Sequence, residues 1–364
     1  MSTTELPIVI DTLKIKALTY INNKTPLTIE DIDIPVVPKD IVQPDELLVE
    51  NKATSLNPID CVFKELSSMK FCPKQTIIGG DFAGTVVKAG SKTKFKAGDN
   101  IYGLVFKSGT RGSCSNYILF KPEDAITCEI IPKGMTFEEA GSSPTVSATA
   151  FQTVSAYKGD LKDKNILVLG GGTSVGAYSI QFAKHYFKAG KVVATCSPRS
   201  AKKALQYGAD VTIDYNKGDQ YKIDELLKFV KENGKFDLIV DTIRDESPMP
   251  YFSSLLKTNN EKGLFSQVGG SYSNDYTKAS LFSFLPSYKY ISNSIKYKVG
   301  LSKYETINHR VAHSETYGKA METLFKSGQL QFPIDSIKDA YTDGEEAFEK
   351  VATSNVSGKV VLKW

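Results

Sequence analysis

The chain has 364 residues, with 45 basic and 41 acidic side chains, a net charge of +4 and 41% hydrophobic residues. This length exceeds what one hydrophobic core usually serves, so we expect two domains. The near balance of charge gives no reason to expect a nucleic-acid partner. Nor does the N-terminus, which carries Glu5 and Asp11, have the pattern of a signal or transit peptide, and no apolar run is long enough to cross a bilayer.

The five cysteines are scattered, odd in number and without a Cys-x-x-Cys pair. This pattern predicts neither a disulfide framework nor a zinc ribbon. We expect reduced, structural thiols and a cytoplasmic location, with Cys61 as a buried and inert thiol rather than a reactive one.

Residues 13–120 predict β-rich structure. The stretches 14–20, 27–34 and 46–53 alternate or carry β-branched residues, and prolines punctuate them. Further strands with glycine turns are expected at 84–90 and 96–103. Many short strands with glycine corners are typical of a small barrel-like domain.

From about residue 137 the pattern changes to alternating strands and helices. Residues 138–151 predict two helices with a break between them. Strands follow near 166–169, 191–196, 211–213, 236–242 and 263–268, separated by helices near 175–187, 200–207 and 222–232. This alternation predicts a parallel sheet with helices on both faces. The tail predicts helices at 316–326 and 344–352 and a last strand at 358–362.

A glycine-rich turn follows the strand predicted at 166–169. It reads Gly170, Gly171, Gly172, Thr173, Ser174, Val175 and Gly176, and a helix is expected to begin within it. Glycines let the backbone approach a bulky anion, and the backbone N–H groups and dipole of a helix N-terminus face it. The turn therefore predicts a binding site for a dinucleotide pyrophosphate. An ordinary strand-to-helix turn that only needs glycine is the alternative.

Nine blocks of the sequence, in order, resemble the zinc-free quinone oxidoreductase (zeta-crystallin-like) branch of the medium-chain dehydrogenase/reductase superfamily. Within that branch the chain is most similar to a fungal subgroup of lipid-droplet-associated, quinone-oxidoreductase-like proteins. The blocks are 57–60, 80–90, 98–103, 109–117, 144–145, the glycine turn, 208–210, 236–241 and 358–361.

The resemblance implies an α/β fold: a Rossmann doubly wound parallel sheet at 137–309, and a GroES-like, β-rich catalytic domain at 1–136 that is completed by 310–364. It also implies NADPH in a cleft between the domains and hydride transfer to a quinone or an enone without zinc. The subgroup implies a cytoplasmic protein, in some members at the surface of lipid droplets or mitochondria.

The residues that follow the second predicted strand of this sheet favour NADPH over NADH. NAD enzymes place an acidic side chain about 20 residues beyond the glycine turn, against the ribose hydroxyls. Here that stretch has no acid and offers Ser197, Arg199 and Lys202, which suit a 2′-phosphate. Tyr215 stands where the family often has a tyrosine near this phosphate, and Gly269 completes the predicted cofactor site. Alternatively, Arg199 and Lys202 are solvated surface cations.

No zinc site is predicted. Zinc-dependent relatives carry a Gly-His-Glu block, and the corresponding residues 79–81 lack the histidine. His309 and His313 are four residues apart, but without the metalloprotease arrangement, and we expect them on a surface helix. Catalytic zinc needs three side-chain ligands, which this sequence does not group together.

By resemblance, Asn57 and Asp60 line the nicotinamide end of the cleft and Thr145 faces the cofactor. The alternatives are structural: Asn57 precedes a proline, as turn openers do, and Thr145 lies where a helix cap is expected. Many active relatives carry a tyrosine soon after the Asn-Pro-x-Asp block, and residues 61–71 contain none.

Two further departures concern the cofactor. Thr173 replaces the middle glycine of the family's turn, and Arg244 stands where the 241–244 segment normally ends in glycine. A catalytically weak or regulatory NADPH-binding protein is therefore the alternative to an active reductase.

The segment 280–299 combines aromatic residues with lysines. Leu281, Phe282, Phe284 and Leu285 would suit a lipid interface, with lysines 289, 296 and 298 at anionic head groups. The alternative is a homodimer interface, because in relatives this region joins two Rossmann sheets and aromatic residues suit such contacts. Pro286 argues against one continuous amphipathic helix.

Overall fold

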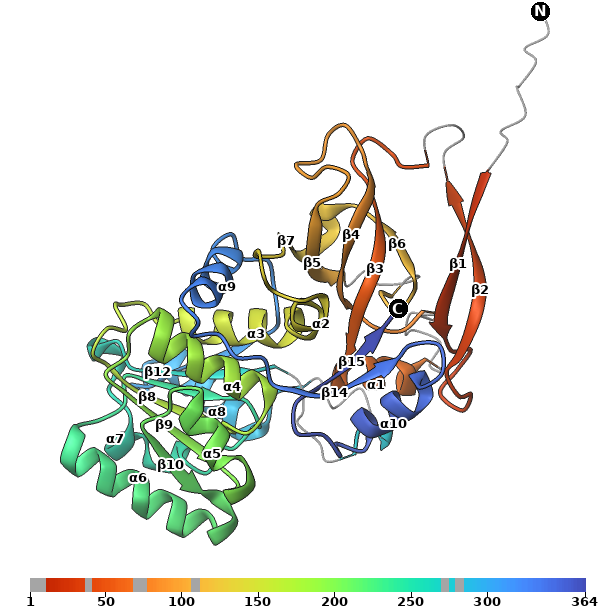
Figure 1. Cartoon of the computed structure of the whole chain (residues 1–364). Helices are drawn as coiled ribbons and strands as arrows, with labels where there is room; N and C mark the ends of the chain where they lie inside the picture. The colour runs from red at the N-terminus through yellow and green to blue at the C-terminus, as the bar shows by residue number, and fades with distance from the viewer. Residues whose placement is uncertain (1–10, 37–40, 68–76, 106–111, 270–274, 279–284) are drawn as a thin grey trace, which may run out of the picture. The chain divides into compact units, whose positions relative to one another are not determined.

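The structure is a computed structural model that describes residues 11–36, 41–67, 77–105, 112–269, 275–278 and 285–364 (Figure 1). The chain divides into two compact units. The first unit comprises Met1–Ser142, Ile337–Val351 and Val360–Trp364, and the second comprises Ser143–Ser336 and Ala352–Lys359.

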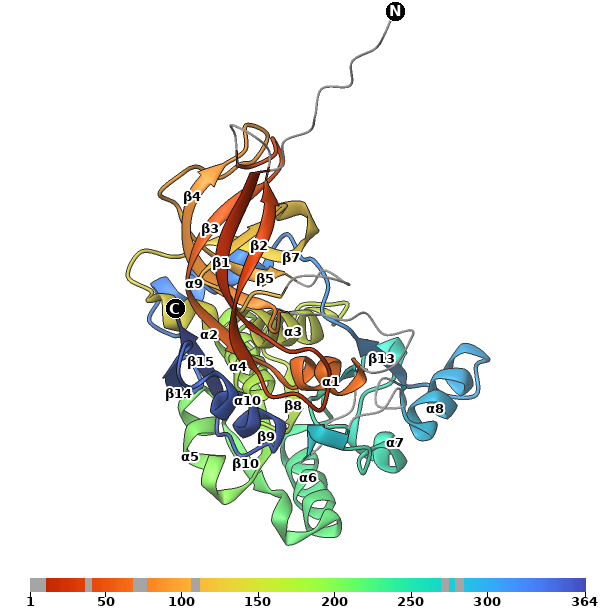
Figure 2. The same cartoon turned by 90° about the vertical axis from the view of Figure 1, so that its right-hand side faces the viewer.

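The first unit is built on β-sheet. Its strands are β1 (Asp11–Thr19), β2 (Thr28–Val36), β3 (Leu47–Leu56), β4 (Asp81–Ala89), β5 (Asn100–Val105), β6 (Tyr117–Phe120) and β7 (Ala125–Ile130). The tail adds β14 (Ile334–Asp339) and β15 (Lys359–Lys363), and the helices are α1 (Pro58–Leu66), η1 (Pro122–Asp124), α2 (Phe137–Ser142) and α10 (Gly344–Ala352). Strands β1 and β2 form an antiparallel pair, visible side by side in Figure 2. The larger sheet has the order β14-β15-β3-β4-β5-β7, with β6 paired to β3.

Strand β3 is the central element of this sheet because it pairs with β4, β6 and β15. Leu47 and Val49 alternate along it and pack with Phe82 and Val86 of β4 in one buried cluster. The tail of the chain thus completes the sheet, because β15 pairs with β3 in antiparallel orientation.

The second unit contains a six-stranded sheet in which every neighbouring pair is parallel. Its order is β10 (Val211–Asp214), β9 (Lys191–Cys196), β8 (Asn165–Leu169), β11 (Leu238–Asp241), β12 (Leu264–Val268) and β13 (Glu305–His309). The longer helices are α3 (Pro144–Ser155), α4 (Ser174–Gln181), α5 (Pro198–Gln206), α6 (Asp219–Asn233), α8 (Tyr288–Lys298) and α9 (Tyr317–Lys326). Shorter ones are η2 (Phe182–Tyr186), η3 (Tyr215–Lys217), η4 (Met249–Tyr251), α7 (Phe252–Leu255), η5 (Asn259–Glu261) and η6 (Tyr276–Lys278).

Each face of this parallel sheet has its own hydrophobic core. On one face Ile166 and Val168 of β8 pack with Ile180 of α4 and Ala204 of α5. On the other face Leu167 and Leu169 pack with side chains of α6 and α7. A strand buried on both faces explains why 166–169 is a continuous apolar run. The expected α/β fold class, which comprises a doubly wound parallel sheet and a β-rich domain, is confirmed.

Three details differ from the expectations. The chain returns to the first unit at Ile337 rather than at residue 310, because α9 packs against the π-helical turn η2 of the second unit. His309 ends strand β13 and His313 follows in irregular backbone, so the surface helix expected for this pair is wrong. The helix expected at 175–187 is α4 followed by η2.

Candidate functional site

The glycine turn joins β8 to α4 at the carboxyl edge of the parallel sheet. Gly170 has φ +84, and a Cβ there would lie 2.5 Å from the Ile243 side chain. A Cβ on Gly176 would lie 2.2 Å from the carbonyl oxygen of Gly170. These two positions require glycine because the backbone of the turn folds tightly against the start of α4. The N–H groups of Ser174 and Val175, in the first turn of the helix, have no acceptor within it and suit an anion.

Thr173 is the N-cap of α4. Its Oγ1 accepts a hydrogen bond from the N–H of Gly176 at 2.9 Å. The same hydroxyl lies 2.9 Å from the Gly170 carbonyl oxygen, to which it donates, and 3.0 Å from the hydroxyl of Thr242. The side chain of Thr173 thus points back into the glycine turn. It binds the N–H of Gly176, which would be available to an anion if residue 173 were glycine.

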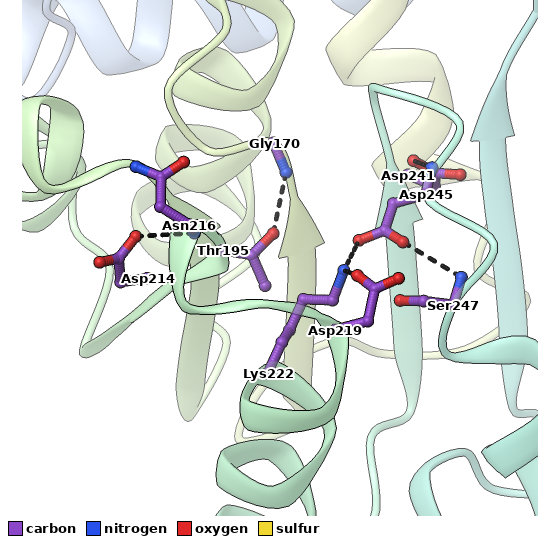
Figure 3. A network of polar contacts seen from close by, with 9 residues as sticks. All are labelled: Gly170, Thr195, Asp214, Asn216, Asp219, Lys222, Asp241, Asp245 and Ser247. Atoms are coloured by element: carbon purple, nitrogen blue, oxygen red, sulfur yellow. Dashed lines mark hydrogen bonds and ion pairs between the residues drawn. The ribbon is translucent and has the colours of Figure 1, made fainter.

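Two neighbouring threonines hold the turn in place. The hydroxyl of Thr195, on β9, accepts from the N–H of Gly170 at 3.2 Å (Figure 3). The hydroxyl of Thr242, after β11, donates to the carbonyl oxygen of Leu169 at 2.8 Å. Local sequence patterns do not predict these threonines, because their role depends on the pairing of β8 with β9 and β11.

The start of α5 lies beside the glycine turn. Ser197 is its N-cap, and Arg199 and Lys202 are exposed on it. A small pocket is lined by Gly171 and Gly172 together with Ser200, Lys203 and Tyr207, which recur on one face of α5, and by Pro333, Ser357 and Gly358. Ser200 and Lys203 thus lie beside the glycine turn, although they are not among the predicted site residues. The signal for them was the helical spacing of residues 200, 203 and 207.

The other residues predicted at the adenosine end also lie along this edge. Tyr215 begins the short helix η3 directly after β10, and its side chain is exposed. Asp214 ends β10 beside Cys196 of β9. The carboxylate of Asp214 accepts a hydrogen bond from the N–H of Asn216 within its own turn (Figure 3).

A buried ion pair ties α6 to the segment after β11. The ammonium of Lys222, of which 3% of the side chain is exposed, lies 2.5 Å from Asp245 and 2.9 Å from Asp219 (Figure 3). Burial alone would lower the pKa of Lys222, but the hydrogen bonds to the two carboxylates raise it. The pair stabilises the loop that carries Arg244 and contacts no predicted site residue directly.

Polar side chains form a chain across the carboxyl ends of β11, β12 and β13. Asp241 accepts from the amide of Gln267 at 2.8 Å, and Gln267 accepts from the amide of Asn308 at 3.2 Å. Burial raises the pKa of Asp241 to about 6. Gly269, which follows β12, donates its N–H to the carbonyl oxygen of His309 at 2.5 Å. The predicted residue Gly269 is thus placed beside Asn308, which the sequence analysis missed.

In the first unit, Asn57 and Asp60 open helix α1. Asp60 accepts from the backbone N–H of Asn57 at 2.7 Å, which caps the helix. The amide of Asn57 donates to the buried carboxylate of Asp81 at 2.8 Å, and the hydroxyl of Ser55 donates to the same oxygen at 2.8 Å. The structural alternative for Asn57 is the opening of a turn, and in the structure this residue precedes a helix instead. The side chains of Asn57 and Asp60 both lie in a buried polar cluster.

Thr145 lies in the first turn of α3, in the second unit. The cap position of that helix is Ser143 and its first residue is Pro144, so Thr145 is not the cap. No group of three His, Cys, Asp or Glu side chains within metal-binding reach occurs in the part of the chain that the structure describes. Nor does a helix in that part have the length and hydropathy needed to cross a membrane.

Two family models match the chain. Residues 43–143 match the alcohol dehydrogenase GroES-like domain, and residues 174–313 match the model described as zinc-binding dehydrogenase. The first match covers most of the β-rich unit, and the second begins at the start of α4 and covers the rest of the parallel sheet.

A curated relative, the protein YIM1 of Saccharomyces cerevisiae, is 29% identical over 365 residues, which are 96% of this chain and 97% of the relative. Among solved structures, the quinone oxidoreductase from Coxiella burnetii superposes with a TM-score of 0.69 at 21% identity, over 97% of this chain and 100% of that one. The Escherichia coli quinone oxidoreductase complexed with NADPH superposes with a TM-score of 0.69 at 20% identity, over 96% and 99%. At these identities the structural similarities establish the fold.

Proposed function

Because the chain belongs to the medium-chain dehydrogenase/reductase superfamily, we propose that it is an NADPH-dependent, zinc-independent reductase of quinones or enones. Membership of this superfamily indicates an oxidoreductase with a dinucleotide-binding domain. The choice of NADPH, the substrate class and the independence from zinc are our inferences from the residues of this chain.

The proposal rests on which side chains follow strand β9 at the carboxyl edge of the sheet, beside the glycine turn. No acidic side chain follows β9, where one would bind the ribose hydroxyls of NAD and repel a 2′-phosphate. Instead α5 begins there, with Ser197 at its cap and Arg199 in its first turn, while Lys203 of its last turn lines the pocket beside the glycine turn. A guanidinium and an ammonium group suit a phosphate monoester.

Zinc does not fit the residues of the first unit that the structure describes. Gly80 stands where zinc-dependent relatives have the histidine of the Gly-His-Glu block. Asp81 stands at the position of the glutamate, and its carboxylate is engaged by the neutral groups of Asn57 and Ser55. Zinc in catalytic sites takes three protein ligands, usually His, Cys or Glu. The proposed reaction therefore relies on orientation and hydrogen bonding rather than on a Lewis acid.

The bound NADPH would supply the hydride, and the protein would position an electron-poor carbon of the substrate against it. By the family resemblance, Asn57, Asp60 and Thr145 would line the nicotinamide end of the site. In that arrangement hydrogen-bond donors stabilise the negative charge that develops on the substrate oxygen.

A binding titration that compares NADPH with NADH tests the proposal. We expect NADPH to bind at least tenfold more tightly, because a paired 2′-phosphate contributes more than about 1.4 kcal/mol. Arg199→Ala and Lys203→Ala should each remove most of this preference and leave NADH affinity nearly unchanged. Lys191→Ala, at the opposite end of β9, is the matched control. Failure of the wild-type protein to bind NADPH would refute the proposal.

The alternative is a weakly active or regulatory NADPH-binding protein, which Thr173 and Arg244 favour because they depart from the family pattern. Turnover with a panel of quinones and enones distinguishes the two. Robust oxidation of NADPH that depends on the acceptor supports the reductase, whereas tight NADPH binding without turnover supports the alternative.

A further inference from the structure

The side chains of Asp241, Gln267 and Asn308 are linked by hydrogen bonds that run in one direction, from Asn308 as a donor to Asp241 as an acceptor. One carboxylate oxygen of Asp241 accepts from the backbone N–H groups of Ile243 and Asp245, both at 3.1 Å. The other oxygen accepts from Gln267. Asp241 and Gln267 are fully buried, so the direction of these bonds is set by the protein and not by solvent.

An ionised carboxylate only accepts hydrogen bonds, so it selects one orientation of the neighbouring amide. Gln267 must present its NH2 group to Asp241, and its oxygen then faces β13. Asn308 must in turn present its NH2 group to that oxygen. The consequence is that the Asn308 oxygen points away from the chain, and in the described part of the molecule it receives no hydrogen bond.

This open oxygen lies at the carboxyl edge of the second half of the sheet. In a doubly wound sheet the two halves each bind one nucleotide, and the pyrophosphate lies between them at the helix after the first strand. Here the pyrophosphate turn follows β8, and Arg199 and Lys203 belong to the β8–β10 half. The nicotinamide of the proposed cofactor would therefore lie over β11–β13, beside Gly269 and Asn308.

We propose that the side-chain oxygen of Asn308 accepts a hydrogen bond from the carboxamide NH2 of the nicotinamide, and that Asp241 and Gln267 are positioning residues that keep Asn308 in this orientation. The inference rests on the proposed function. Gly269 leaves the approach open, since a Cβ there would lie 3.0 Å from the Asn308 oxygen and 2.6 Å from the carbonyl oxygen of His309.

The test uses the reduced 3-acetylpyridine analogue of NADPH, in which a methyl group replaces the carboxamide NH2. Wild-type protein should bind NADPH at least fivefold more tightly than the analogue, which corresponds to about 1 kcal/mol for one hydrogen bond. Asn308→Ala should bring this ratio close to one by weakening NADPH alone. Asn293→Ala, which removes an amide that α8 donates to the backbone at Tyr304, should leave the ratio unchanged.

Asp241→Asn gives a readout that a purely structural role would not produce. The new amide keeps its oxygen toward the two backbone N–H groups and presents its NH2 group to Gln267. Gln267 must then turn over, and Asn308 must present its NH2 group outward. The analogue, which offers only a carbonyl oxygen, should then bind as tightly as NADPH or more tightly. Gln267→Met interrupts the chain without reversing it and should give a ratio near one.

Adenosine 2′,5′-bisphosphate separates this inference from the proposed function, because it lacks the nicotinamide. If neither it nor NADPH binds, the cofactor assignment itself is wrong. If it binds equally to the wild type and to every variant, but the wild type does not distinguish NADPH from the analogue, the role of Asn308 is overturned and the NADPH site stands. A ratio in Asp241→Asn equal to that of the wild type would overturn the positioning role of Asp241.

Discussion

Arg244 combines a left-handed backbone with a long charged side chain. Its φ is +58, a conformation that costs a residue with a Cβ about 1 kcal/mol. Its guanidinium donates to the carbonyl oxygen of Leu285 at 2.8 Å, which offsets part of that cost. The family's usual glycine explains the backbone conformation, and the arginine keeps it while adding a contact to the segment before α8.

Substitutions at Arg244 should separate these two effects. Arg244→Ala loses the hydrogen bond and keeps the strain, whereas Arg244→Gly loses the hydrogen bond and relieves the strain. We expect the alanine variant to be less stable than the glycine variant by about 1 kcal/mol, measured by urea unfolding. An alanine variant as stable as the glycine variant would show that the backbone at this position is not strained.

Two buried groups, Asp241 and His309, should make the free energy of unfolding depend on pH in opposite directions. Burial raises the pKa of Asp241 from 3.8 to about 6, so its contribution is full below pH 4 and is lost as the pH rises through 6. Burial lowers the pKa of His309 from 6.5 to about 4, so its contribution is full above pH 6.5 and is lost as the pH falls toward 4.

The two pH dependences can be measured by comparing the free energy of unfolding of the wild type with that of a variant at each position. Between pH 4 and pH 7 the stability of the wild type relative to Asp241→Asn should fall by up to about 3 kcal/mol. Relative to His309→Gln it should rise by a similar amount. Chemical denaturation at several pH values checks both. Parallel pH profiles for the wild type and either variant would contradict the assigned burial of that group.

Helix α4 shows how one substitution changes both an element's stability and its capacity to bind an anion. Thr173 satisfies the N–H of Gly176 from within the protein. N-capping of this kind stabilises a helix by about 1 kcal/mol, of which glycine at the same position retains most. The cap therefore stabilises the turn while reducing the number of N–H groups available to a pyrophosphate.

Thr173→Gly should therefore bind NADPH more tightly, by up to about tenfold for one added hydrogen bond to a charged group, with a loss of stability of only a few tenths of a kcal/mol. Thr173→Ser, which keeps the hydroxyl, should match the wild type in both respects. Calorimetric titration and thermal unfolding measure the two effects. Weaker NADPH binding in Thr173→Gly would mean that the threonine supports the site rather than limiting it.

At the scale of the whole molecule, α8 and the turn that follows it present an exposed apolar stripe beside strand β13 of the parallel sheet. Tyr288, Ile291, Ile295, Val299 and Leu301 are between 42% and 83% exposed. Tyr290 of the same helix packs inward and donates to the carbonyl oxygen of Thr306 on β13. Among the strands that the structure describes, β13 is the last of its sheet, and an open edge readily pairs with another strand. The residues Leu281, Phe282 and Phe284 of the predicted aromatic surface lie outside the described residues.

We propose that a second copy of the chain covers this stripe and pairs along β13. Ile295→Asp should convert the dimer to a monomer in sedimentation experiments because it places a carboxylate in an apolar interface. Val211→Asp, at an exposed position on the opposite edge strand β10, is the control. A wild-type monomer at micromolar concentration would refute the dimer. In that case, binding to anionic vesicles that Ile295→Asp abolishes would support the lipid-surface alternative.

The sequence by itself determined the secondary-structure pattern, the parallel sheet and the glycine turn. Apolar runs such as 166–169 and the break before Pro144 are local signals, and their consequences follow from burial and backbone geometry alone. It also supplied the candidates at the adenosine end, since Ser197 and Arg199 directly follow a strand whose end is readable from the pattern.

Only the tertiary structure decided which side chains meet across strands. Thr195 and Thr242 hold the turn, and Asp241, Gln267 and Asn308 form a hydrogen-bonded chain, because parallel pairing aligns strand ends whose contacting residues are 25 to 73 positions apart in the sequence. Lys203 joins the pocket at the turn because α5 packs there. The position of His309 in strand β13 also follows from this pairing, whereas the helix cap formed by Thr173 is a local contact with Gly176. Local patterns specify where a strand ends, whereas the neighbours at that end depend on strand order, which is set by the packing of the whole sheet.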